Sequence, residues 1–115
     1  MSAIDFGSLI MTYGDPENIH STVLKRQTVE LLDVRDGGTY VDATLGLGGH
    51  AEAILQSSPN VRMVGIDQDG AALALAGERL DRFRGRIDLV NANFSELAAV
   101  LKGLGTEKID GIIAD

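Results

Sequence analysis

The chain has 115 residues with 44% hydrophobic and 4% aromatic content, so it can form one domain with an aliphatic core. Its formal net charge of −7 at pH 7 argues against strong nonspecific binding of nucleic acid by this stretch alone. The absence of cysteine excludes a disulfide framework and a thiolate zinc site, and it fits the cytoplasmic location that we predict. No apolar run approaches the roughly 18 residues of a membrane span, so no membrane association is expected.

The first half of the chain leads from an irregular segment into alternating helices and strands. Residues 1–19 have no clear hydrophobic period, and we expect a mobile lead-in there. A helix is predicted from Ser21, as its N-cap, to about Val34. The turn Asp36–Gly38 then precedes a first strand at Thr39–Ala43, and the next helix is predicted from His50 to about Gln56.

The second half of the chain continues this alternation. Strands are predicted at Val61–Ile66, Ile87–Val90 and Ile109–Ala114, with helices at Ala71–Phe83 and Phe94–Leu104. Such an order implies parallel strands joined by right-handed crossovers. The strands are apolar on both faces, as a sheet between two layers of helices requires. We therefore predict an α/β fold with about four parallel strands and flanking helices.

The fourth predicted strand runs almost to Asp115, the last residue. A doubly wound sheet normally continues beyond a fourth strand, so we interpret residues 20–115 as the N-terminal part of a larger domain, truncated after strand four. A sheet that stops there exposes a strand edge, through which copies of the chain could pair. Self-association is therefore one expected behaviour of this chain.

The most informative motif is the stretch Asp42–His50, which joins the first strand to the next helix. It contains Gly46, Gly48 and Gly49. A strand that breaks into a glycine turn and restarts as a helix is where nucleotide-like ligands dock in α/β folds, because glycine lets the backbone approach the ligand. We expect His50 to contribute its backbone N–H at the helix start rather than its imidazole.

An acidic residue at the end of the second strand supports the same interpretation. Asp67 lies nineteen residues after Gly48, where a carboxylate is well placed to accept hydrogen bonds from ribose hydroxyls. Asp69 is interpreted as the N-cap of the following helix. Because no third ligand accompanies these two carboxylates, we predict no metal site.

Two classes of cofactor fit the glycine turn. Gly46, Gly48 and Ala51 form an allowed variant of the dinucleotide pattern G-x-G-x-x-G/A. However, the carboxylate of Asp42 would repel a pyrophosphate and attract the cationic sulfonium and ammonium groups of S-adenosylmethionine. We therefore predict S-adenosylmethionine as the cofactor. The alternatives are an NAD-type binding domain of an oxidoreductase and an inactive truncated module.

Residues after the third and fourth strands are further candidates for the site. Phe94 could pack against an adenine ring, or it could close the following helix onto the sheet. Asp115 lies at the tip of strand four, where amino-group methyltransferases place a polar residue near the target nitrogen, although an aspartate there can also simply serve a turn. Four arginines between residues 79 and 86 alternate with acidic residues, which favours a solvated helix end over an RNA-binding patch.

Taken together, these motifs resemble the ribosomal RNA small subunit methyltransferase H family (MraW-like). The resemblance runs from about residue 20 to the end of the chain. It is carried by four blocks in the family's order: Tyr40–His50, Gly65–Asp69, Asn93–Ser95 and Ile109–Asp115. The first block is far more specific than a generic glycine motif.

The resemblance implies a Rossmann-like, S-adenosylmethionine-dependent methyltransferase fold, present here in part. It implies N4-methylation of a cytidine in 16S ribosomal RNA, with 16S RNA or the small ribosomal subunit bound through regions mostly absent from this chain. The implied cofactor-contacting positions are Gly48, Gly49, His50, Asp67, Phe94 and Asp115. Asp115 is also the candidate for positioning the target amino group. We predict no turnover by the isolated 115 residues.

Overall fold

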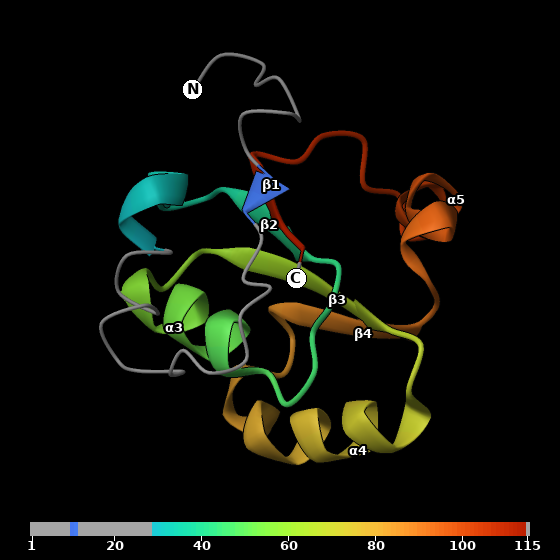
Figure 1. The fold of residues 1–115 in the computed structure, drawn as a ribbon. Helices are drawn as coiled ribbons and strands as arrows, with labels where there is room; N and C mark the ends of the chain where they lie inside the picture. Colours follow the sequence, from blue (N-terminus) through green and yellow to red (C-terminus); the bar gives the residue numbers. More distant parts are fainter. Residues whose placement is uncertain (1–9, 12–28, 115) are drawn as a thin grey trace.

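The structure is a computed structural model and describes residues 10–11 and 29–114. A parallel sheet forms its centre, with the strand order β1-β5-β2-β3-β4 (Figure 1). The strands are β1 (Ile10–Met11), β2 (Thr39–Asp42), β3 (Arg62–Asp67), β4 (Ile87–Asn91) and β5 (Gly111–Ile113). The chain adds β3 and β4 on one side of β2 and then returns to add β5 on the other. This change of direction at β2 is a topological switch point, where α/β sheets commonly bind ligands.

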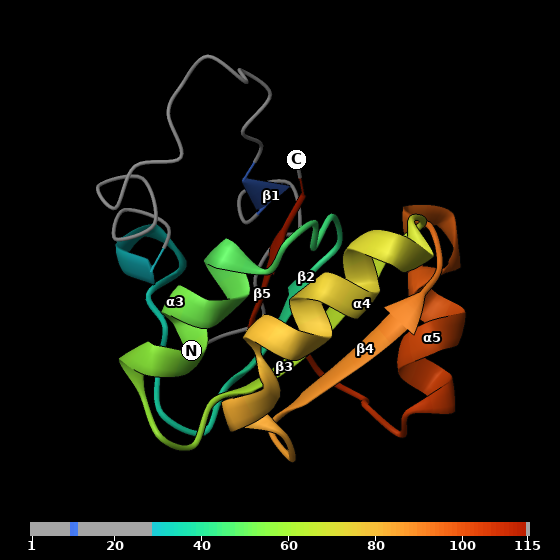
Figure 2. The ribbon, with the colours of Figure 1, turned by 90° about the horizontal axis from the view of Figure 1, so that it is seen from below.

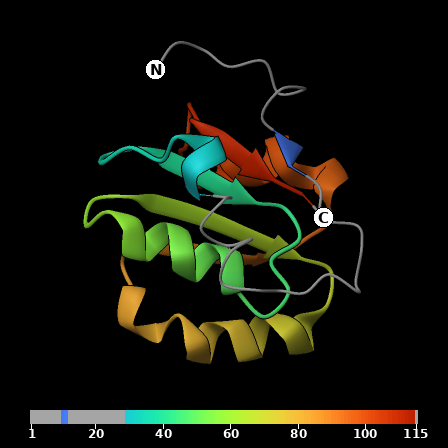
Figure 3. The ribbon, with the colours of Figure 1, turned by 60° about the vertical axis from the view of Figure 1, so that its left-hand side comes forward.

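Helices cover both faces of the sheet. On one face lie α3 (Gly49–Ser57) and α4 (Gly70–Arg79), as Figure 2 shows from below. On the opposite face lies α5 (Leu97–Gly103), so the fold has three layers (Figure 3). The short 3-10 turns η1 (Asp81–Phe83) and η2 (Phe94–Glu96) follow α4 and precede α5. Among the described residues, no helix is long and apolar enough to span a bilayer.

A separate hydrophobic core fills each face of the sheet, because successive side chains on a strand point to opposite sides. On β2, Tyr40 joins the core beneath α3 and α4, whereas Val41 joins the core beneath α5. Both side chains are fully buried. The first core also includes Ile54, Leu55, Val61, Met63, Ala76, Leu80, Phe83 and Ile113. The second includes Ala43, Val64, Ile66, Ile112 and Ala114.

The α/β class and the four strands predicted from the sequence are confirmed, with strand ends that differ by one or two residues. The structure adds β1, a strand that the sequence analysis did not predict, within the segment interpreted as a lead-in. It pairs with β5 through Ile10–Ile112 and Met11–Ile113, so the expectation that the fourth predicted strand exposes its edge is wrong along these residues. Of the helix predicted from residue 21, residues 29–32 are helical and residues 21–28 lie outside the described residues. This helix ends early because Asp33 adopts a left-handed φ of 52°.

Two later helices are also shorter than the hydrophobic period suggested. The helix expected over residues 71–83 ends as α4 at Arg79, and η1 follows after Leu80. The backbone N–H of Phe83 donates to the carbonyl of Leu80, three residues earlier, at 2.9 Å. This spacing is that of a 3-10 helix, whereas an α-helix bonds residues four apart. The helix expected from Phe94 begins instead with the 3-10 turn η2. Hydrophobic period alone does not distinguish these tighter turns from α-helix.

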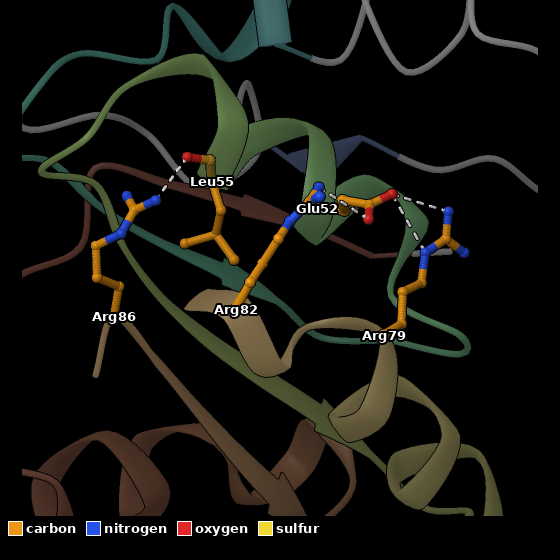
Figure 4. A network of polar contacts seen from close by, with 5 residues as sticks. All are labelled: Glu52, Leu55, Arg79, Arg82 and Arg86. Carbon is orange, nitrogen blue, oxygen red and sulfur yellow. Dashed lines mark hydrogen bonds and ion pairs between the residues drawn. The ribbon is translucent and has the colours of Figure 1, made fainter. Parts of the chain in front are cut away.

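An ion-pair network joins α3 to the end of α4 and to η1 (Figure 4). The Glu52 carboxylate on α3 accepts from the guanidinium of Arg79 at 3.0 Å and from that of Arg82 at 3.3 Å. Arg79 and Arg82 are 37% and 57% exposed, so the stabilisation from each pair is modest. Both side chains are exposed to solvent, as expected for a solvated helix end, although their acidic partner, Glu52, lies on another helix.

Arg86 differs from Arg79, Arg82 and Arg84 because its guanidinium binds backbone carbonyls rather than carboxylates. Its guanidinium donates to Leu55 O and Ser58 O at 2.8 Å each, and to Val61 O at 3.1 Å. Figure 4 shows the bond to Leu55. Leu55 lies in the last turn of α3, where carbonyls lack helical partners. Arg86 therefore caps α3 and fixes the chain between α3 and β3.

Candidate functional site

The candidate site lies at the carboxyl edge of the sheet, where β2, β3 and β4 end side by side. Asp67, the last residue of β3, lies level with Asn91, the last residue of β4. Asp42, the last residue of β2, lies level with Gly65. The glycine turn follows β2 directly and leads into α3. The glycine turn, Asp67 and the segment after β4 therefore lie at neighbouring strand ends, which is the arrangement that binds ligands in open α/β sheets.

The glycine turn needs glycine for two physical reasons. Gly46 and Gly48 have φ angles of 56° and 87°, in the left-handed region that favours glycine. In addition, a Cβ on Gly48 would lie 3.0 Å from Leu80 Cδ1 and 3.5 Å from the Cβ of Ala76. Gly48 thus lets the turn pack directly against α4. As N-cap of α3, Gly48 offers no side chain to the first-turn N–H groups.

Asp67 joins the glycine turn to the end of β3. Its Oδ2 accepts from the backbone N–H of Gly46 at 2.8 Å, and its Oδ1 accepts from that of Asp69 at 2.8 Å. The Leu45 N–H also donates to the carbonyl of Ile66 at 2.9 Å. An ionised carboxylate has about four acceptor positions. Two backbone donors therefore leave capacity for the hydroxyls of a ribose.

A small pocket of about 110 Å³ opens beside this carboxylate. It is lined by Ala43, Thr44, Asp67, Gln68, Asn93 and Phe94. The structure therefore brings together Asp67 and Phe94, two of the predicted cofactor residues. The Phe94 residue is 45% exposed, and α5 packs on the sheet through Leu97 and Val100 instead. Of the two interpretations of Phe94, this favours a ring available to a ligand.

The other predicted residues that the structure describes do not line this pocket. Gly48 is buried, and Gly49 and His50 are half-buried in the first turn of α3. Asp42 is 1% exposed, and its Oδ1 accepts from the Thr44 N–H at 3.1 Å, which shapes the start of the turn. Asp115 lies outside the described residues.

Asp69 and Asn93 cap helical segments near the pocket, and three residues without a predicted role line it. The Asp69 side chain accepts from the N–H groups of Ala71 and Ala72 at 2.9 and 3.3 Å, so its predicted role as an N-cap is confirmed. Either Asn93 or Ser95 was expected to cap the next helical segment, and Asn93 does so through a capping box with Glu96. Sequence reasoning did not assign Thr44, Gln68 or Asn93 to the pocket. Among the described residues no cluster of three or more His, Asp or Glu side chains could hold a metal ion.

A larger hollow of about 400 Å³ lies at the opposite, amino edge of the sheet. It is lined by Arg35, Asp36, Gly37, Gly38, Thr39, Tyr40, Lys108 and Asp110. Much of its polar surface is already used. Asp110 accepts from the Thr39 N–H at 2.9 Å, and the Tyr40 hydroxyl accepts from the Arg35 N–H at 2.9 Å. Burial raises the pKa of the Tyr40 hydroxyl. No predicted site residue lies there, so we assign the candidate site to the carboxyl edge despite the smaller pocket.

Similarity to known proteins covers most of the chain. Residues 17–115 match the MraW methylase family. The chain belongs to this family. It is 49% identical over 96 residues to the ribosomal RNA small subunit methyltransferase H of Desulfovibrio desulfuricans. The aligned region covers 84% of this chain and 29% of that protein. The chain therefore spans about 30% of the length of the curated relatives it matches.

Solved structures show the same fold. TrmN from Thermus thermophilus superposes with a TM-score of 0.68 at 26% identity, covering 80% of this chain and 27% of that one. A SAM-dependent O-methyltransferase from Thermotoga maritima gives a TM-score of 0.61 at 17% identity, covering 68% and 31%. The Rossmann-like methyltransferase fold predicted from the sequence is thus confirmed. Membership of the MraW methylase family agrees with S-adenosylmethionine as the cofactor rather than with the NAD-type alternative.

Proposed function

We propose that this chain carries the cofactor-binding part of an enzyme that methylates the N4 amino group of a cytidine in 16S ribosomal RNA, using S-adenosylmethionine. The observation that supports this most strongly is the Asp67 carboxylate. It is held by the Gly46 N–H at 2.8 Å and lies in one pocket with the exposed Phe94 ring. The relatives' shared name, ribosomal RNA small subunit methyltransferase H, supports the substrate class.

Each side of the pocket suits one part of the proposed cofactor. The Asp67 carboxylate would accept from the ribose hydroxyls, and the Phe94 ring would stack on the adenine. The first turn of α3, at Gly49 and His50, would direct its N–H groups toward the cofactor's carboxylate, since helix N-termini favour anions. The buried Asp42 carboxylate lies at the end of β2, where negative charge favours a cationic ligand.

The chemistry requires alignment more than acid–base catalysis. S-adenosylmethionine, when bound, supplies a methyl group activated by the attached cationic sulfonium. The task of this chain's residues is to hold that group in line with the cytidine amino nitrogen, because orientation dominates such reactions. We propose that Asp115 holds the target amino group. The cytidine must leave its stack to reach the pocket.

The RNA partner would be 16S ribosomal RNA or the small ribosomal subunit. With a net charge of −7, this chain would bind RNA poorly in a nonspecific manner. The RNA contacts would therefore come largely from regions like those of the longer relatives that this chain does not match. We therefore expect no turnover by the isolated 115 residues. Detectable methylation of ribosomal RNA by this chain alone would contradict that expectation.

A thermal melt with and without ligand tests the cofactor assignment. S-adenosylmethionine should raise the melting temperature, because a ligand at a hundredfold excess over its Kd adds about 2.7 kcal/mol of apparent stability. NAD should not. The Asp67→Ala variant should lose the response. Asp36→Ala, which removes a carboxylate at the amino edge, should keep it.

Three other outcomes would each reject part of the proposal. A shift with NAD alone would favour an oxidoreductase domain. A cooperative melt with no shift would mean that these residues do not suffice to bind the cofactor. Concentration-dependent association without any ligand response would favour a noncatalytic, self-associating module.

A further inference from the structure

Asn91 makes two hydrogen bonds at the candidate site that the proposed chemistry does not use. It is the last residue of β4, and its side-chain Nδ2 donates to the carbonyl of Asp67 at 2.9 Å and to that of Gln68 at 3.0 Å. The next residue, Ala92, also donates its N–H to the Asp67 carbonyl, at 3.1 Å. Both N–H donors of one amide are thus spent on two successive carbonyls of a single turn.

The turn that Asn91 holds is the one that presents the pocket's polar wall. Asp67 and Gln68 both line the pocket, whereas Asn91 itself does not. Immediately after them, Asp69 donates its N–H to the Asp67 carboxylate and then caps α4. The orientation of that carboxylate therefore depends on the path of the backbone from residue 67 to residue 69.

We propose that Asn91 is a positioning residue for the Asp67 carboxylate, an inference that rests on the proposed cofactor site. Asn91 never touches the ligand. Its two bonds fix the carbonyls of Asp67 and Gln68, so that the Asp67 side chain faces both the Gly46 N–H and the ribose position. Because Asn91 is exposed, its bonds contribute little to folding and more to the alignment of the turn.

Isothermal titration with S-adenosylhomocysteine, the demethylated product, tests this assignment. Asn91→Ala should weaken binding about 3- to 30-fold, the range expected when one or two hydrogen bonds that orient a group are lost. Asn91→Asp, of the same shape but without the N–H donors, should weaken it at least as much. The melting temperature of Asn91→Ala should change little, which separates positioning from a structural role.

A matched control and a double-mutant cycle sharpen the result. Asn60→Ala removes another exposed asparagine, whose Nδ2 donates to Asp36 at 2.9 Å at the amino edge, and it should leave affinity unchanged. If Asn91 acts through Asp67, adding Asn91→Ala to an Asp67→Asn background should cost less than about twofold more. Equal losses in both backgrounds, or an unchanged Kd in Asn91→Ala, would overturn the proposal.

If the wild-type chain does not bind S-adenosylhomocysteine, that result counts against the proposed function alone. Amide hydrogen exchange then tests the role of Asn91 without any ligand. In Asn91→Ala, the amides of Gly46 and Asp69 should exchange about tenfold faster, because both donate to the Asp67 carboxylate. The amide of Val64, inside β3, should be unaffected. Unchanged exchange at both Gly46 and Asp69 would show that Asn91 does not position the carboxylate.

Discussion

At the carboxyl edge of the sheet, the Asp67 carboxylate accepts from two backbone N–H groups and lies in one pocket with an exposed phenyl ring. At the amino edge, the Asp36 carboxylate accepts from the Ser58 hydroxyl and from both the backbone and side-chain nitrogens of Asn60. The amino edge has the larger hollow, yet both carboxylates that line it, Asp36 and Asp110, already accept hydrogen bonds from groups of the chain. We therefore base the assignment of the candidate site on spare acceptor capacity beside an exposed aromatic ring rather than on the size of a hollow.

The largest loss of stability should come from substituting Gly48 at the carboxyl edge, with Gly37 at the amino edge as the matched comparison. Gly48→Ala should lower the free energy of unfolding by about 2–4 kcal/mol, since it adds left-handed strain and a 3.0 Å contact with Leu80. Gly37→Ala, at a φ of 84° with open space around it, should cost about 1–2 kcal/mol. Urea unfolding of both variants measures the difference. Equal losses in the free energy of unfolding would mean that the Leu80 side chain moves aside at no energetic cost. The carboxyl-edge turn would then not be tightly packed.

Arg86→Ala should have the next largest effect. Three carbonyls lose a charged donor, so we expect a loss of about 1–3 kcal/mol in the free energy of unfolding. Arg84→Ala is the matched control, because the Arg84 side chain is 79% exposed and pairs with Asp81, an ion pair worth about 0–1 kcal/mol. Product affinity well below the melting temperature should be the same in both. A lower affinity in Arg86→Ala would show that the two edges are coupled.

The smallest effect should be a dependence of stability on acid pH that arises at the amino edge. Hydrogen bonds from Ser58 and Asn60 lower the pKa of Asp36. A carboxyl whose pKa is depressed by folding contributes stability above its unfolded value, near 3.9, and loses that contribution as the pH falls through the folded pKa. Urea midpoints measured from about pH 5 to pH 2 should therefore fall less steeply in Asp36→Asn than in the wild type. Ser58→Ala should give an intermediate slope, and identical slopes in all three would refute this origin.

The sequence was sufficient to predict what short patterns encode. The strand ends, the glycine turn, Asp67 and the Asp69 cap all follow from local spacing and propensity. The exposure of Phe94 was left open, because one sequence cannot show whether a ring covers the core or faces solvent. The helix ends near residues 80 and 94 were missed, since 3-10 turns share the hydrophobic period of a helix.

Contacts between distant segments could not be predicted in this way. Arg86 reaches carbonyls 25 to 31 residues earlier in the chain, and nothing in its neighbours indicates those partners. The hydrogen bond from the Asn91 side chain to the Asp67 carbonyl depends on the register between β3 and β4, which places these two residues level. Strand register is set by packing across the whole sheet, so it becomes visible only in three dimensions.

Tyr40 provides an optical probe of this sheet. The chain contains two tyrosines and no tryptophan, so its near-ultraviolet fluorescence comes from tyrosine alone. The Tyr40 ring is fully buried, and a Cβ on Gly38 or Gly111 would lie within 3.0 Å of it. Its phenolate absorbance should therefore emerge only when the centre of the sheet opens. In a Tyr13→Phe background, which removes the other tyrosine, an alkaline titration followed by ultraviolet absorbance would report that opening without any added label.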